Sequence, residues 1–118
     1  MSDMAPDEFR RIALSLPQTE EIYRRGQSKF RVARHAFAAL EGPGDSVAIV
    51  HLTPDQQSDF MHAAPNAFTP VPGGWGRLGA TQVHLAAVTK ALLQSALGSA
   101  WRNAAPPALL SKVGQRSN

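Results

Sequence analysis

The stretch SKFRVARHAFAAL, residues 28–40, decides the fold. Phe30 and Val32 share one face of an extended segment, and both are apolar. Lys29 and Arg31 share the other face, and both are basic. This period of two is typical of a half-buried strand. The segment AFAAL follows after a short link, so the stretch predicts two neighbouring strands that pair antiparallel.

Further strands flank this pair along the chain. An earlier strand at residues 21–25 is expected to turn back through Gly26-Gln27. After the pair, the turn residues GPGD (42–45) lead to SVAIVHL (46–52), which predicts a fourth strand. Because the links between these strands are short, the sequence predicts an antiparallel meander.

Amphipathic helices are expected on both sides of the meander in sequence. Phe9, Ile12 and Leu16 fall on one helical face, and Pro17 ends that helix. TPDQ (53–56) begins a second helix, because its Thr is a favoured N-cap and its Gln stands at the capping-box position. The stretch through Pro70 and Pro72 reads as irregular, and TQVHLAAV (81–88) as a further strand. Apolar residues from Val88 to about Asn103 predict a closing helix.

These elements predict an α+β fold with an antiparallel meander sheet flanked by N-terminal and C-terminal helices. We expect a single domain over residues 1–105 and a frayed tail over residues 106–118, in which Leu109 and Leu110 have a packing role. The predicted core consists of Phe9, Ile12, Leu16, Phe30, Val32, Phe37, Leu40, Ile49, Phe60, Trp75, Leu92 and Trp101.

Composition excludes several classes of site. The 118 residues include no Cys, so the chain has no disulfide, thiol nucleophile or thiolate metal site. The four His show no metal-ligand spacing, and no HExxH, GxSxG or Walker pattern occurs. We therefore expect no catalytic residue, no metal and no cofactor. The polar N-terminus and the interrupted apolar stretches favour a soluble cytoplasmic monomer.

The residues GWGRLG (74–79) match the dinucleotide-binding pattern G-x-G-x-x-G. That pattern binds a pyrophosphate only between a first strand and a helix, with an acid about 20 residues later. Here prolines precede it, an extended segment follows it, and no acid occurs after Asp59. The match is therefore interpreted as accidental. The glycines are expected to serve a tight turn, and Trp75 is expected to pack in the core.

Charge is distributed unevenly along the chain, whose formal net charge is +3. All acids lie at or before Asp59, and residues 22–34 carry basic residues but no acid. Such a basic surface favours anionic partners. The candidate DNA-binding residues are Arg24, Arg25, Lys29, Arg31, Arg34 and Arg77, which would contact phosphates and read little sequence.

Two other interpretations of these basic residues remain open. They form a solvated face balanced by nearby acids, or they bind an acidic protein or a small anionic ligand. Arg102 is assigned a structural role instead, because it follows Trp101 on a mostly apolar helix. We expect it to pair with Glu20 or Glu21.

The chain resembles the MmcQ/YjbR-like family of small bacterial proteins. The resemblance rests on the order of FRRIALSLPQTEE (9–21), KFRVARHAFAAL (29–40), LTPDQQSDF (52–60), VPGGWGRLGATQVHL (71–85) and AWRNAAP (100–106). It implies an α+β fold similar to the frataxin/CyaY-like topology, and a DNA-binding role in which the hairpins act as two wings. The resemblance implies no catalytic residues.

The chain departs from that family at three places. Gln18 stands where a Gly often follows Leu-Pro, and Arg34-His35 replaces a tight Gly-Lys turn. The second change adds positive charge at a hairpin tip. Gly98 lies inside the closing helix, where Gly costs about 1 kcal/mol relative to Ala.

Overall fold

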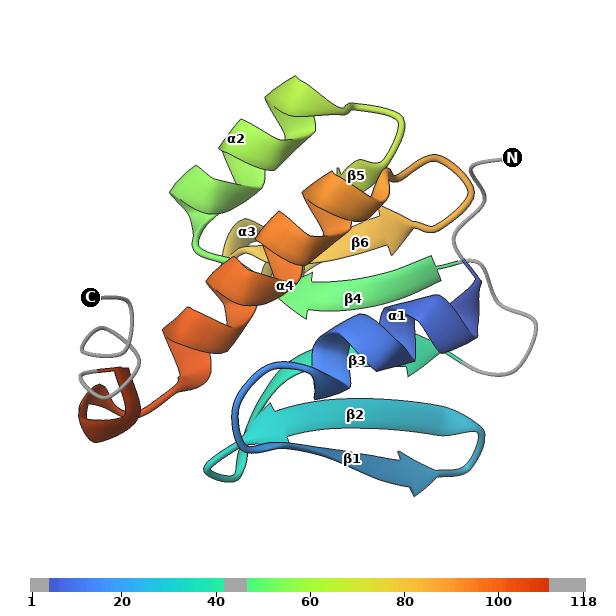
Figure 1. The fold of residues 1–118 in the computed structure, drawn as a ribbon. Coiled ribbons are helices and arrows are strands. Elements are labelled where there is room, and N and C mark those ends of the chain that lie inside the picture. The colour runs from blue at the N-terminus through green and yellow to red at the C-terminus, as the bar shows by residue number, and fades with distance from the viewer. Residues whose placement is uncertain (1–4, 42–46, 111–118) are drawn as a thin grey trace.

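The structure is a computed structural model that describes residues 5–41 and 47–110. It is an α+β fold in which helices pack on a six-stranded antiparallel sheet (Figure 1). The strands are β1 (Thr19–Arg24), β2 (Gln27–Val32), β3 (His35–Glu41), β4 (Val47–His51), β5 (Phe68–Pro70) and β6 (Ala80–His84). The helices are α1 (Pro6–Leu14), α2 (Pro54–Ala63), α3 (Gly74–Arg77) and α4 (Lys90–Ala104). The predicted turn at 42–45 and the predicted fraying of 111–118 lie outside the described residues.

The strand order is β1-β2-β3-β4-β6-β5, and each neighbouring pair is antiparallel. The predicted meander of four strands and the later strand β6 are therefore confirmed. Two-residue turns join β1 to β2 through Arg25-Gly26 and β2 to β3 through Ala33-Arg34. All four turn residues have positive φ, which is the backbone of the type I′ turns that match strand twist in hairpins.

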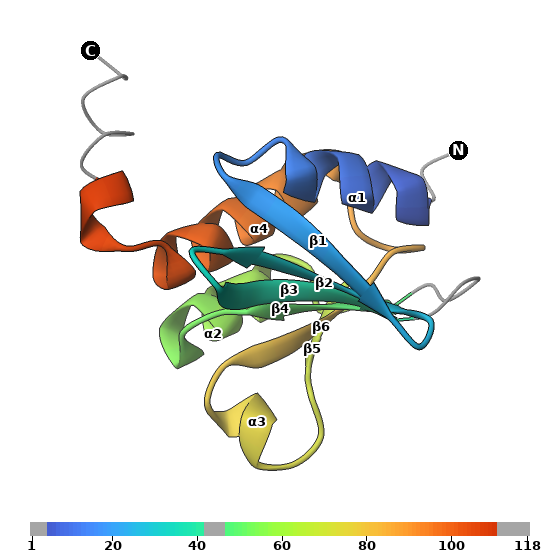
Figure 2. The same cartoon turned by 90° about the horizontal axis from the view of Figure 1, so that it is seen from below.

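The core lies between the sheet and the helices α1 and α4. Phe30 and Val32 are fully buried, and the ring of Phe30 meets that of Phe9 of α1 edge to face, with centroids 5.7 Å apart. Trp101 of α4 is also buried, and its ring N–H donates to the Pro17 carbonyl at 3.0 Å. Figure 2 shows α1 and α4 on one side of the strands, whereas α3 projects on the opposite side.

The helix boundaries follow from local capping chemistry. Thr53 accepts from the Gln56 backbone N–H at 3.2 Å, and the Gln56 side chain accepts from the Thr53 N–H at 2.9 Å. The predicted capping box of α2 is therefore confirmed. Thr89 caps α4 in a similar way, through a bond from the Leu92 N–H.

Two residues predicted for the core lie elsewhere. Trp75 is 70% exposed. Gly76 of α3 packs against the backbone of Val71, and the neighbouring Trp75 points outward. Ile49 is half-buried, because it alternates with the fully buried Ala48 and Val50 and so lies on the face away from α1 and α4. The prediction of a buried Trp75 was wrong.

The stretch predicted as irregular contains the strand β5. Pro70 ends it, and the strand lies at the edge of the sheet, where a missing backbone donor is tolerated. Phe68 of β5 is buried, and its ring packs 5.1 Å from that of Phe60 of α2. The proline signal therefore marked an edge strand and not a loop.

The chain continues beyond α4 with a helical turn at residues 107–110. Leu109 and Leu110 pack against the core there, so the first part of the segment predicted to fray makes tertiary contacts. Among the described residues, no helix is both long enough and apolar enough to cross a membrane.

Candidate nucleic-acid interface

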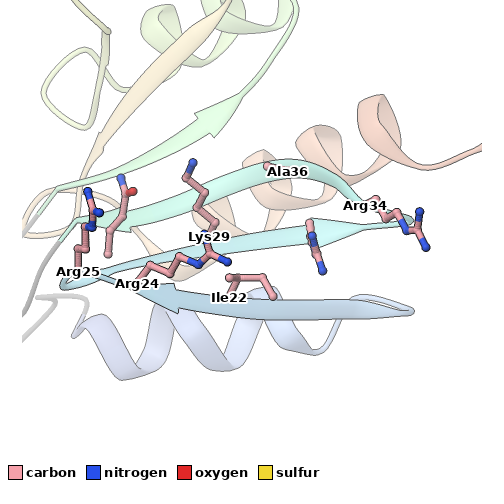
Figure 3. Close-up of a pocket in the computed structure, with 8 residues that line it drawn as sticks. Ile22, Arg24, Arg25, Lys29, Arg34 and Ala36 are labelled. Carbon is pink, nitrogen blue, oxygen red and sulfur yellow. The ribbon is translucent and has the colours of Figure 1, made fainter.

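Five of the six candidate basic residues line one concavity of about 400 Å³ on the sheet face away from α1 and α4 (Figure 3). Arg25 and Arg34 lie at its two ends, in the hairpin turns, and Lys29 lies between them. The residues that line it are Ile22, Arg24, Arg25, Gln27, Lys29, Arg31, Arg34 and Ala36. The concavity therefore follows the length of β2, about 20 Å for a strand of this size.

The register of the strands explains this grouping. Lys29 stands opposite Ile22 of β1, and Arg31 stands opposite Glu20. A bulge between Phe30 and Arg31 shifts the pairing with β3, so that Arg31 meets Ala36. Small residues on β3 leave space above this strand, and that space is the concavity. The basic side chains of β1 and β2 border it.

Most of these cations form no salt bridge with an acid that the structure describes. The Arg31 Nε lies 2.6 Å from Glu20 Oε1, so this pair is neutralised. Within the described residues, no salt bridge involves Arg24, Arg25, Lys29 or Arg34. Arg31 is therefore balanced by a nearby acid, as the interpretation of a solvated face expects, whereas the other four have no salt bridge among the described residues.

The acids of the first helix are engaged on the other side of the sheet. Arg10 contacts Asp7 at 2.9 Å and Glu21 at 3.0 Å, and Glu8 contacts Arg11 at 2.9 Å. Ser28 also donates to Glu21, at 2.5 Å. These pairs engage the acids of α1 and Glu21 away from the concavity.

His51 of β4 is electrostatically coupled to this face. Its ring keeps contact with solvent, but neighbouring atoms cover enough of it for desolvation to lower the pKa of His51 below 6.5. The positive charge of Lys29 lowers the pKa of His51 further. His51 is therefore neutral near pH 7. No sequence pattern indicates this coupling, which arises because β2 and β4 lie on either side of β3 and present side chains on the same face of the sheet.

Arg77 and Arg102 lie apart from the concavity. Arg77 is in α3, which joins β5 to β6 at the sheet edge far from β1. Arg102 is exposed and forms no salt bridge among the described residues. The expected pairing of Arg102 with Glu20 or Glu21 is therefore wrong, because Arg31 and Arg10 occupy those carboxylates.

The histidines do not assemble a metal site. His51 and His84 lie at opposite ends of the β4–β6 pair, since His51 is in register with Ala80 and His84 with Val47. His84 Nε2 lies 2.9 Å from Thr69 Oγ1. In the part of the chain that the structure describes, no group of three or more His, Cys, Asp or Glu residues is placed to hold a metal ion.

Two solved structures share this fold. DR2400 from Deinococcus radiodurans, which carries a DUF419 domain, superposes with a TM-score of 0.67 at 20% identity, over 81% of this chain and 75% of its own. A protein from Pseudomonas syringae superposes with a TM-score of 0.67 at 13% identity, over 86% of this chain and 99% of its own. No family model and no curated protein matches the sequence. At 20% and 13% sequence identity, these similarities show a shared fold alone.

Proposed function

We propose that this protein is a non-enzymatic module that binds DNA without sequence preference through the basic concavity of β1, β2 and β3. One observation supports this most: Arg24, Arg25, Lys29 and Arg34 border a single concavity and have no acidic partner among the described residues. Several cations on one open sheet face can contact successive phosphates of a nucleic-acid strand.

Contacts to phosphates contribute affinity but do not distinguish one DNA sequence from another. Phosphate contacts carry no base information directly, and Ala36, the β3 residue that lines the concavity, has no hydrogen-bonding side chain. Non-specific binding of this kind has a Kd of roughly micromolar or weaker at physiological salt. We therefore expect weak, strongly salt-dependent binding to DNA of any sequence.

We also propose membership of the MmcQ/YjbR-like family, whose segments occur in this chain in the same order. The α+β fold and the solved neighbours are compatible with that family. In the DNA-binding role implied by the resemblance, the β1–β2 and β2–β3 hairpins would act as the wings, with Arg25 and Arg34 at their tips. A cytoplasmic monomer stays a prediction.

The test is a charge-reversal variant measured by fluorescence anisotropy on labelled duplex DNA at low salt. Arg24→Glu with Lys29→Glu is the sharpest choice, because these residues face Gln27 and Ile22 across the β1–β2 ladder. Arg31 is less suitable, because a Glu there would stand opposite Glu20 and repel it. We expect the double variant to lose binding while its melting temperature stays near that of the parent.

A matched control changes the same charge elsewhere. Lys90→Glu with Arg102→Glu alters two exposed cations of α4, on the opposite side of the sheet. Because Lys90 lies 3.6 Å from Glu8, the melting temperature of this control is measured to establish that it is folded. This control is expected to keep most of the DNA affinity. Equal losses in both double variants would show that net charge alone drives binding, and the proposal would then fail.

A small polyanion is the second candidate ligand. The volume of the concavity, about 400 Å³, lies within the range of small-molecule sites, and several guanidinium groups border it. Calorimetry with tripolyphosphate separates the candidates. Tight binding of that anion with no affinity for DNA would favour a ligand-binding module over a DNA-binding one.

A further inference from the structure

Two large apolar side chains are exposed together at the end of the sheet. Trp75 is 70% exposed and Leu78 is 69% exposed. They are three residues apart on the helical turn of α3, so they share one face of it. Trp normally buries most of its ring, so an exposed Trp beside an exposed Leu points to a binding role.

The backbone that presents this pair is firmly held. The Gln57 Nε2 of α2 lies 3.1 Å from the Gly76 carbonyl and 3.0 Å from the Ala80 carbonyl. A Cβ on Gly76 would lie 1.9 Å from the Val71 carbonyl oxygen, so this turn packs directly on neighbouring backbone. Trp75 is therefore presented from a fixed support, which reduces the entropy cost of binding.

One cation accompanies this pair. Arg77 lies in the same turn, and residues 60–118 contain no acid. α3 projects on the side of the sheet away from α1 and α4, which is also the side of the basic concavity (Figure 2). The β2–β3 turn with Arg34 lies at the same sheet end, about 15 Å away across β3, β4 and β6.

We propose that Trp75 stacks on an unpaired base of single-stranded nucleic acid whose phosphates continue into the basic concavity. This inference rests on the proposed function and adds to it a preference for single strands over duplexes. In a duplex the base faces are covered by their neighbours, whereas every unpaired base offers a face to an aromatic ring. Arg77 contacts the phosphate beside the stacked base, and a strand of a few nucleotides spans the distance to Arg34.

The experiment compares an oligothymidylate of about 15 nucleotides with its oligoadenylate duplex, using tryptophan fluorescence and anisotropy at low salt. Trp101 is buried, so quenching reports on Trp75. We expect the single strand to quench the tryptophan fluorescence of the parent protein. We also expect it to bind the parent more tightly than the duplex does. Trp75→Ala should weaken single-strand binding about fivefold to a hundredfold and leave duplex binding within about twofold. Trp75→Phe should retain most of the affinity.

The matched control is Tyr23→Ala. Tyr23 is also a largely exposed aromatic, at 64%, but it alternates with Ile22 and Arg24 and so faces away from the concavity. This variant should bind both probes as the parent does. Melting temperatures of all variants establish that they are folded.

The outcomes separate this inference from the proposed function. If Trp75→Ala binds the single strand as the parent does, or weakens both probes equally, stacking on single strands is wrong. Loss of duplex binding in Arg24→Glu with Lys29→Glu would then still support the proposed function. If the parent binds neither probe, both proposals fail.

Discussion

At the scale of single residues, several turns of this chain adopt left-handed backbone without glycine. Gln18 has φ 53°, and Ala33 and Arg34 have φ 50° and 72°. This conformation costs roughly 1–2 kcal/mol for a residue that carries a Cβ. The Gly expected from the family resemblance at position 18 would avoid that cost, so the departure noted in the sequence has a physical consequence.

We predict that Gln18→Gly stabilises the protein. The Gln18 side chain makes no hydrogen bond among the described residues, so its removal loses little. The strain removed from the folded state exceeds the entropic cost of ordering a Gly on folding. The free energy of unfolding should therefore rise by about 0.5–1 kcal/mol. Urea unfolding measures the gain, and Gln18→Ala, which keeps the Cβ, is the control. A Gly variant no more stable than the Ala variant would refute this account.

The lowered pKa of His51 predicts how stability depends on pH. Because the folded pKa lies below the unfolded value of 6.5, the unfolded state binds a proton more readily. His51 therefore contributes a loss of stability as pH falls below about 6.5. Thermal melts at about pH 8 and about pH 5 measure the loss. His51→Gln should lose less over this range, and an identical loss in the two proteins would contradict the assignment.

At the scale of elements, the glycines of GWGRLG serve packing. A Cβ on Gly79 would lie 1.9 Å from the Leu52 carbonyl oxygen, and Gly79 has φ 111°. Gly76 is similarly close to the Val71 carbonyl, whereas Gly74 has nothing within 4 Å of its Cβ position. The turn interpretation thus holds for Gly76 and Gly79 through close backbone approach.

This difference predicts a graded response to alanine. Gly76→Ala and Gly79→Ala should each lower the free energy of unfolding by about 2–4 kcal/mol, because backbone must move to admit the methyl group. Gly74→Ala should change it by less than about 0.5 kcal/mol. Chemical denaturation of the three variants provides the measurement. Equal, small effects at all three positions would show that the turn is not tightly packed.

The elements with strong local signals could be predicted from the sequence. Alternation around Phe30 and Val32 specified β2 and its basic face, and Thr53 with Gln56 specified the start of α2. To predict the candidate site, the register of the paired strands must be known as well. Periodicity placed Lys29 and Arg31 together, but only strand pairing shows that Glu20 neutralises Arg31.

The failures share a physical cause. Trp75 and β5 depend on tertiary contacts that no local pattern encodes, namely the docking of α3 on Val71 and the edge position of Pro70. The expected partner of Arg102 is wrong because sequence position does not show which carboxylates lie within reach of its guanidinium. Partner choice among long charged side chains is settled by packing and not by spacing.

At the scale of the whole molecule, the sheet separates charge. Carboxylates of α1 and β1 pair with Arg10, Arg11 and Lys90 on the helix side. The opposite face keeps four cations without acidic partners among the described residues. The net charge of +3 understates this asymmetry, which is the feature that would direct a polyanion to one face.

The salt dependence of duplex DNA binding tests this account most directly. If Arg24, Arg25, Lys29 and Arg34 each neutralise one phosphate, the slope of log affinity against log salt should be about −4. Neutralising two of them, in Arg24→Gln with Lys29→Gln, should reduce the slope to about −2. A parent slope near zero, or an unchanged slope in the double variant, would contradict DNA binding by this concavity.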